Sequence, residues 1–277
     1  MNSERIKTDE KPVESGLFAD ANAFLREGER VDDLQFKRLR LIQSPAAFCF
    51  GTDSVLLTHF ALGAIARAKR GACIVDMGSG SGAISLLLAA KTGLCVTAVE
   101  IDEEQCERFS RTLNLNGIKT EGESEGRGDV GEIQIVCADY LSEGFKFERK
   151  FDHAVCNPPY FRLGSGGSPK HAGATHEESA DIFSIAEAAR RLLKYGGSFS
   201  LCFPAERLAE ALTALSVNAL EPKTLRLVRT KAGKKPYLAL IRAKHGAKPG
   251  LTVEDELTVL DEDGKYTPEV QRYYNGE

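Results

Sequence analysis

Residues 73–90 read CIVDMGSGSGAISLLLAA, and this stretch decides the fold. It opens with 73–76, a short run that is apolar except for Asp76 and favours a buried strand. It leads into 83–91, a mostly apolar run of helical length. Between them Gly78, Gly80 and Gly82 alternate with other residues, and glycine lets a backbone turn sharply and approach a ligand closely. The stretch therefore predicts a strand, a turn that can hold a nucleotide-like molecule, and a buried helix.

The alternation of strands and helices continues toward the C-terminus, as in a parallel sheet with helices on both faces. Further strands are predicted at 95–99, 133–137, 153–156, 198–203, 224–228 and 237–241, and helices at 103–114, 181–193 and 205–217. Gly196 is placed to end the helix over 181–193. The predicted fold class is α/β, a doubly wound and mostly parallel seven-stranded sheet with helices on both faces.

Composition divides the chain into four expected parts. Residues 1–30 form a polar N-terminal extension, and residues 31–70 pack on the glycine turn. Residues 71–248 hold the sheet. Residues 249–277 form a C-terminal strand-turn-helix appendage, with its strand at 257–260 and its helix beginning at 267–268. Thr52 or Asp53 is placed to cap a helix that Ser54 begins. The connections 119–131 and 162–176 are predicted loops.

Overall composition and net charge narrow the class of protein and its expected location. The chain has 277 residues, of which 42% are hydrophobic, and a net charge of -4, which does not indicate a nucleic-acid binder. Residues 222–253, however, contain nine lysines and arginines and no acid, so this segment can meet phosphate or can form a solvated face balanced by acidic helices elsewhere. With no signal segment and no apolar run near the ~20 residues of a membrane helix, a cytoplasmic location is expected.

The seven cysteines show no zinc-ligand or CxxC spacing. Five of them fall inside predicted strands and are interpreted as small buried hydrophobes: Cys73, Cys95, Cys137, Cys156 and Cys202.

A second informative stretch is Asn157-Pro158-Pro159-Tyr160, which follows the mostly apolar run 151–156. Two consecutive prolines cannot continue a sheet ladder, so the strand must end there. The turn offers the Asn157 amide oxygen and the Pro158 carbonyl as acceptors for an amino group, and the Tyr160 ring as a surface for stacking. The alternative is an ordinary Pro-Pro turn that ends a strand.

Acidic residues support a cofactor site at the glycine turn. Asp76 precedes the turn, Glu100 ends the next predicted strand, where an acid commonly binds ribose hydroxyls, and Asp139 follows a later strand. The glycine spacing is neither that of dinucleotide-binding enzymes nor that of a P-loop.

Together these motifs resemble those of a known enzyme family. The stretch from Asp76 to Gly82, followed by Glu100, resembles the S-adenosylmethionine site of class I methyltransferases, and Asn157 to Tyr160 resembles the catalytic motif of their amino-methylating members, including N6-adenine enzymes. From about Val31 to the end, segments 32–43, 50–53, 157–161 and 261–267 resemble the bacterial valine-tRNA adenine-37 N6-methyltransferase family. The resemblance implies a methyltransferase domain at 71–248 that methylates the exocyclic amino group of an anticodon-loop adenine in a valine tRNA.

The resemblance also implies roles for single residues. The catalytic residues would be Asn157, Pro158 and Tyr160, with Phe161 as a second wall for the base, and no metal is expected. On the cofactor side, Asp76 would order the turn and the methionyl amine, and Gly78, Gly80 and Gly82 would form the turn. Glu100 would bind the ribose, Ile101 one face of the adenine and Asp139 the adenine amino group. Thr52 and Asp53 are further candidates for cofactor binding. His153 is expected to be a packed core histidine.

Two other functions stay open on the sequence. A protein-glutamine methyltransferase of the release-factor type has the same Asn-Pro-Pro-Tyr motif, because a glutamine amide fits the same two acceptors. A non-catalytic RNA-binding module could keep the cofactor fold, although intact glycines, Glu100 and Asn157 argue against it. The basic segment 222–253 favours RNA over a protein substrate.

Overall fold

The computed structural model describes residues 21–45, 50–66, 69, 71–118, 127–148, 150–158 and 181–275. The strands of the main sheet are β3 (Cys73–Met77), β4 (Cys95–Glu100), β5 (Ile133–Cys137), β6 (Phe151–Cys156), β7 (Leu193–Pro204), β8 (Leu220–Arg229), β9 (Leu238–His245), β10 (Thr252–Val253) and β11 (Leu257–Thr258). The α-helices are α1 (Thr52–Ile65), α2 (Ala83–Thr92), α3 (Glu103–Leu115), α4 (Ile182–Leu192), α5 (Leu208–Val217) and α6 (Pro268–Asn275). Two 3₁₀-helices, η1 (Ala21–Phe24) and η2 (Ala205–Arg207), and a hairpin of β1 (Arg30–Asp33) and β2 (Arg40–Gln43) complete the described elements.

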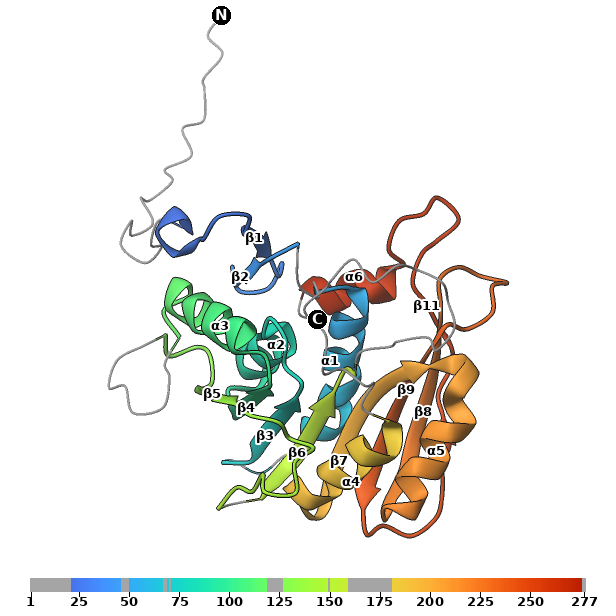
Figure 1. Ribbon diagram of the computed structural model, residues 1–277. Coiled ribbons are helices and arrows are strands. Elements are labelled where there is room, and N and C mark those ends of the chain that lie inside the picture. The colour runs from blue at the N-terminus through green and yellow to red at the C-terminus, as the bar shows by residue number, and fades with distance from the viewer. Residues whose placement is uncertain are drawn as a thin grey trace, which may run out of the picture.

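The main sheet has nine strands in the order β10-β8-β9-β7-β6-β3-β4-β5, with β11 also paired to β8 (Figure 1). Strands β3 to β7 pair in parallel, whereas β9 runs antiparallel to both β7 and β8. The strands β10 and β11 are only two residues long each, and they extend the predicted set of seven at the β8 edge. The predicted fold class is confirmed.

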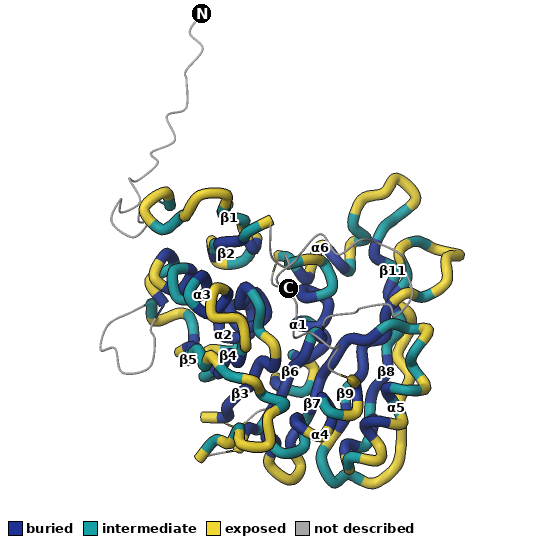
Figure 2. Tube along the Cα trace, in the orientation of Figure 1, coloured by how far each residue is buried: buried dark blue, intermediate teal, exposed yellow. Residues whose placement is uncertain are grey.

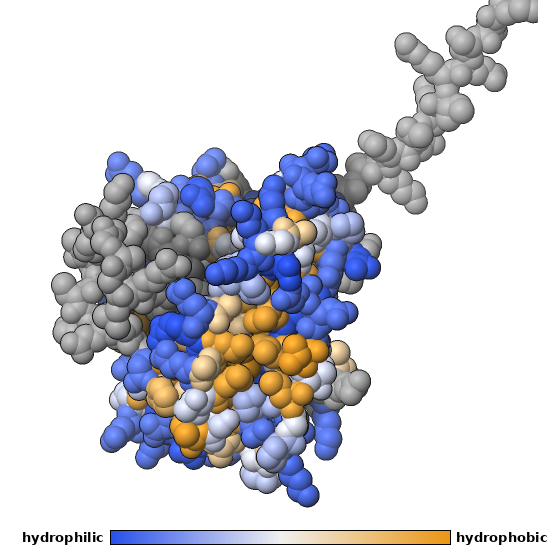
Figure 3. Space-filling model, turned by 90° about the vertical axis from the view of Figure 1, so that its right-hand side faces the viewer, coloured by the Kyte–Doolittle hydropathy of each residue, from blue (hydrophilic) through white to orange (hydrophobic). Residues whose placement is uncertain are grey.

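The sheet separates two apolar cores. Figure 2 shows that the central strands between them are mostly buried. One core packs α1, α2, α3 and α6 against one face, and the other packs α4 and α5 against the opposite face. All residues from Ala83 to Ala90 are buried, so α2 is covered on every side as its apolar sequence predicted. The side of the molecule next to α5 and β8 carries an apolar area at its surface (Figure 3).

Two predicted helix ends are wrong. Helix α1 begins at Thr52 with Gly51 as its N-cap and no side-chain cap bond, so neither Thr52 nor Asp53 caps it. Helix α4 ends at Leu192, and the chain enters β7 at once because Leu193 pairs with Phe151; Gly196 lies inside that strand. Tertiary pairing ended this helix before its local stop signal.

The cysteine interpretation holds for three of five residues. Cys73, Cys156 and Cys202 are buried, but Cys95 is half-buried and Cys137 is exposed. Cys137 is the last residue of β5, which is an edge strand of the sheet, so one side has no neighbouring strand to cover it. His153 is buried and bonds Ser198 through Nδ1 at 2.7 Å, as expected for a core histidine.

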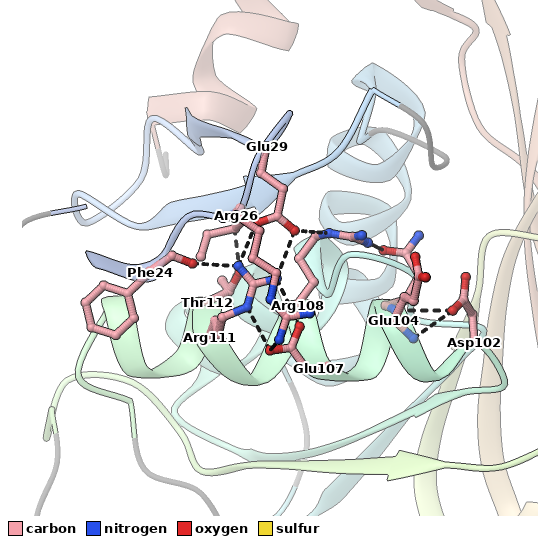
Figure 4. A network of polar contacts seen from close by, with 11 residues as sticks. Phe24, Arg26, Glu29, Asp102, Glu104, Glu107, Arg108, Arg111 and Thr112 are labelled. Carbon is pink, nitrogen blue, oxygen red and sulfur yellow. Dashed lines mark hydrogen bonds and ion pairs between the residues drawn. The ribbon is translucent and has the colours of Figure 1, made fainter. Parts of the chain in front are cut away.

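An ion-pair network ties the N-terminal part of the chain to α3 (Figure 4). The Glu29 carboxylate accepts hydrogen bonds from Arg108 Nε at 2.9 Å and from Arg111 Nη1 at 2.6 Å. The two guanidinium groups lower the pKa of Glu29 from 4.5 to about 2, with the Arg111 bond as the largest cause. Arg111 also donates to the carbonyl of Phe24, so one side chain holds both η1 and the start of β1.

The C-terminal helix α6 packs on α1. The Tyr273 ring stacks on His59 with 3.6 Å between the ring centroids, and Arg226 of β8 forms an ion pair with Glu269 at 2.7 Å. Burial and the charge of Lys91 lower the pKa of His59 to about 4, so the stacked imidazole is neutral near pH 7. Within the described ranges no helix is long and apolar enough to cross a membrane.

Candidate active site

The register of the parallel strands brings the candidate residues to one edge of the sheet. Met77 pairs with Val99 and with Cys156, Glu100 pairs with Cys137, and Cys156 pairs with Leu201. The carboxyl ends of β3, β4, β5 and β6 therefore lie level. The glycine turn, Asp139 and Asn157 follow three of these ends, and Glu100 is the last residue of β4, so all four lie at the same end of the sheet. In open α/β sheets this carboxyl edge is the usual ligand site.

The glycine turn follows β3 with a left-handed backbone at each predicted glycine: φ is 74° at Gly78, 53° at Gly80 and 85° at Gly82. A Cβ added at Gly80 would meet no atom within 4 Å, so open space lies beside the backbone there. A Cβ at Gly82 would lie 2.2 Å from the Phe109 ring of α3. Gly80 thus leaves room for a ligand, whereas Gly82 allows α3 to pack against the start of α2.

Asp76 is fully buried beneath this turn. Its Oδ2 accepts a hydrogen bond from Ser85 Oγ of α2 at 2.7 Å, whereas its Oδ1 has no partner among the residues that the structure describes. Burial, together with the neighbouring Glu100 carboxylate of β4, raises the pKa of Asp76 to about 7, against the opposing effect of the Ser85 bond. The buried Cys156 thiol of β6 also faces it, and its own pKa is raised by burial and by Asp76.

Glu100 holds the turn from the neighbouring strand. Its Oε2 accepts from the Gly80 backbone N–H at 2.7 Å, and its Oε1 accepts from the N–H groups of Ile101 and Asp102 at 2.9 and 3.0 Å. Burial raises the pKa of Glu100, while these three bonds favour the ionised form. Four lone-pair positions on a carboxylate leave room for a ribose hydroxyl as well.

Ile101 and Asp139 lie at the same edge as exposed residues. Ile101 is 61% exposed, so its apolar side chain is open to a ligand. Asp139 orders the turn after β5, because its Oδ1 accepts from the Leu141 N–H at 2.8 Å. Together with the orphaned Asp76 oxygen and the open space at Gly80, these groups fit a nucleotide-like molecule that carries an amine.

Asn157 is the first residue after β6 and is half-buried. Its Nδ2 donates to Ser54 Oγ of α1 at 3.2 Å, and its Oδ1 accepts from the Cys202 thiol of β7 at 3.0 Å. Pro158 is buried beside it. Pro159, Tyr160 and Phe161 lie outside the described residues, as does the predicted loop 162–176, so Tyr160 as a stacking surface stays a prediction.

The first turn of α1 lies beside this motif. Thr52 Oγ1 bonds the Tyr266 hydroxyl at 3.0 Å, and Asp53 Oδ1 accepts from the Tyr237 hydroxyl at 2.8 Å. Burial raises the pKa of Asp53, and the Tyr237 bond opposes this shift. Both residues that the sequence proposed as caps are thus engaged with tyrosines far along the chain.

Sequence reasoning missed several residues of this region. Ser54 and Cys202 contact Asn157, Tyr237 and Tyr266 hold the first turn of α1, and the Tyr140 ring lies 3.7 Å from the Cβ position of Gly78. Tyr140 could have been found from its place directly after Asp139. The other four lie 40 or more residues from the group that they contact, so no local motif contains them.

The basic segment 222–253 is partly neutralised. Arg226 pairs with Glu269 and Arg229 pairs with Glu256, so C-terminal carboxylates balance two of its three arginines. Lys234 and Lys235 are exposed in the β8–β9 turn, shortly before Tyr237 bonds Asp53. Positive charge therefore remains beside the first turn of α1.

Comparison with known proteins identifies the family. Residues 38–217 match the family model described as "Methyltransferase small domain". This chain belongs to that methyltransferase family. It is 30% identical over 239 residues to the tRNA1(Val) (adenine(37)-N6)-methyltransferase of Shewanella sp. (strain MR-4), which covers 85% of this chain and 94% of the relative. The enzyme of the same name from Phocaeicola vulgatus is 32% identical over 203 residues, covering 73% of this chain and 79% of the relative.

Solved structures share the fold of this methyltransferase. A "predicted O-methyltransferase" from Agrobacterium tumefaciens superposes with a TM-score of 0.60 at 21% identity, over 81% of this chain and 96% of that one. The T. thermophilus 16S rRNA N2 G1207 methyltransferase, solved in complex with AdoMet and guanosine, gives a TM-score of 0.53 at 21% identity, over 80% of this chain and 52% of that one. At this identity the likeness shows the class I methyltransferase fold.

Proposed function

We propose that this methyltransferase transfers a methyl group from S-adenosylmethionine to the exocyclic amino group of an adenine in RNA, namely adenine 37 of a valine tRNA. The observation that carries the proposal is the position of Asn157. It lies at the same sheet edge as the glycine turn, and its amide is held by side chains from two other elements. The names of the relatives that share 85% of the chain agree with this substrate.

S-adenosylmethionine, when bound, supplies a methyl group on a positively charged sulfur. Asp76 would hold the methionyl amine through its orphaned Oδ1, and Glu100 and Ile101 would hold the ribose and one adenine face. The glycine turn lets the backbone approach that molecule, and the Glu100 carboxylate orders the turn by accepting from the Gly80 N–H.

The adenine amino nitrogen is a poor nucleophile because its lone pair is delocalised into the ring. The Asn157 Oδ1 and the Pro158 carbonyl would accept its two hydrogens, favour a more tetrahedral nitrogen, and stabilise the positive charge that develops on it. The proton can leave to solvent after transfer, so the site needs no strong base. Tyr160 would stack on the extruded base, and a single-stranded anticodon loop makes extrusion easier.

The test is methylation of defined RNA. Purified protein is incubated with a deuterated methyl donor and a valine tRNA transcript, and nucleosides and oligonucleotides are analysed by mass spectrometry. We expect labelled N6-methyladenosine at position 37, and Asn157→Ala should keep cofactor binding while losing most turnover. A parallel reaction offers a release factor in place of the tRNA. Label in a release-factor glutamine and not in the RNA, or equal turnover in the variant, would overturn the proposal.

A further inference from the structure

Within the described part of the chain, two chemically different side chains contact the amide of Asn157. Ser54 Oγ lies 3.2 Å from the amide nitrogen, and the Cys202 thiol lies 3.0 Å from the amide oxygen. An amide nitrogen donates hydrogen bonds and an amide oxygen accepts them. Both partners are buried, Ser54 at 5% exposure and Cys202 at 0%, so solvent does not compete for the two bonds.

The two bonds hold the amide at both of its ends and so fix its plane. A hydroxyl and a thiol can each donate or accept a hydrogen bond, so Ser54 and Cys202 accommodate either end of the amide. The substrate decides between the ends: its amino group presents hydrogens, which only the amide oxygen can accept. Because an amide oxygen has two lone pairs, the thiol bond leaves the oxygen the capacity to accept a second donor.

The two partners come from rigid parts of the fold. Cys202 lies in β7 directly after Leu201, which pairs with Cys156, so strand register places it beside Asn157. Ser54 lies in the first turn of α1, where the preceding residues Thr52 and Asp53 are bonded to Tyr266 and Tyr237. Three consecutive residues of this turn therefore reach three separate parts of the chain.

We propose that Ser54 and Cys202 are positioning residues that hold the plane of the Asn157 amide for methyl transfer. The inference rests on the proposed function of Asn157 as the acceptor of the substrate amine. It assigns no contact between either residue and the substrate: both act through the Asn157 amide. The expected signature is a loss of turnover without a loss of binding, since a misoriented acceptor weakens the transition state more than the ground state.

The kinetic test compares paired variants with the valine tRNA transcript. Ser54→Ala and Cys202→Ala should each lower kcat about three- to tenfold, the size of one hydrogen bond, with KM for tRNA and Kd for S-adenosylmethionine unchanged. Cys202→Ser keeps a donor and should retain near wild-type kcat. The controls are Ser200→Ala on the same strand and Cys73→Ala, both buried and outside the site. An unchanged kcat, or a change in KM alone, would overturn the inference.

A second measurement does not depend on any substrate. In protein labelled with ¹⁵N-asparagine, the Asn157 side-chain amide is identified by its loss in Asn157→Asp. Ser54→Ala should shift this amide signal, whereas Cys73→Ala should not, and an unmoved signal in Ser54→Ala would refute the hydrogen bond. If wild-type protein methylates no RNA while the amide signal responds, the proposed function fails and the orientation by Ser54 stands.

Discussion

Replacing Gly82 by alanine tests how the glycine turn is built. Gly82 and Gly93 flank α2 and both have a left-handed backbone, with φ of 85° and 67°. An alanine in this conformation costs about 1–2 kcal/mol at either position. Only at Gly82 does the new Cβ meet another group, because it would lie 2.2–2.3 Å from three ring atoms of Phe109, whereas at Gly93 nothing lies within 4 Å.

The Phe109 contact sets the expected difference between the two variants. Carbon atoms pack at about 3.5–4.0 Å, so the fully buried ring must move by more than an ångström. Overpacking of this kind costs about 1–3 kcal/mol, which gives about 2–5 kcal/mol in total for Gly82→Ala against about 1–2 kcal/mol for Gly93→Ala. Urea unfolding followed by circular dichroism measures both losses.

A third variant separates packing from ligand binding. Gly80→Ala has open space around its Cβ, so its stability should match that of Gly93→Ala while its affinity for S-adenosylmethionine falls. In a double-mutant cycle, Phe109→Ala should remove the extra cost of Gly82→Ala. If Gly82→Ala proves no less stable than Gly93→Ala, the assignment of Gly82 to helix packing is refuted.

Three further predictions follow from charges in the structure. Asp76 must be ionised to bind an amine. In calorimetric titrations the affinity for S-adenosylmethionine should therefore rise about tenfold per pH unit up to the Asp76 pKa of about 7 and then level off. The variant Asp76→Asn should show an affinity that does not change with pH. Glu29→Gln should lower the free energy of unfolding at pH 7 by about 1–3 kcal/mol. Because the pKa of Glu29 is depressed, this stability is present above pH 4.5 and is lost as the pH falls toward 2, so urea midpoints of wild type and variant should converge over that window. The double variant Lys234→Ala/Lys235→Ala should raise KM for tRNA in a salt-dependent way. Lys244→Ala should not, because Lys244 pairs with Ser198 of β7, at the opposite end of β9 from Tyr237 and its bond to Asp53.

The sequence by itself determined the order of strands and helices and the two local motifs of the site. The glycine turn and Asn157-Pro158 are local motifs of a few residues. Glycine permits the turn's left-handed backbone, and proline ends the strand, so both conformations follow from the residue types alone. Burial of α2 also followed from its composition, because a helix that is apolar on every side must be covered.

Only the tertiary structure decided which side chains contact these motifs. Strand register, not spacing along the chain, brings Cys202 beside Asn157, and helix packing brings Ser54 to its other side, 103 residues away in sequence. For the same reason Gly196 did not end α4, because the pairing of Leu193 with Phe151 is a long-range contact that outweighs a local preference of about 1 kcal/mol. Thr52 does not cap α1, because the helix already includes it, and its hydroxyl bonds Tyr266, 214 residues away in sequence.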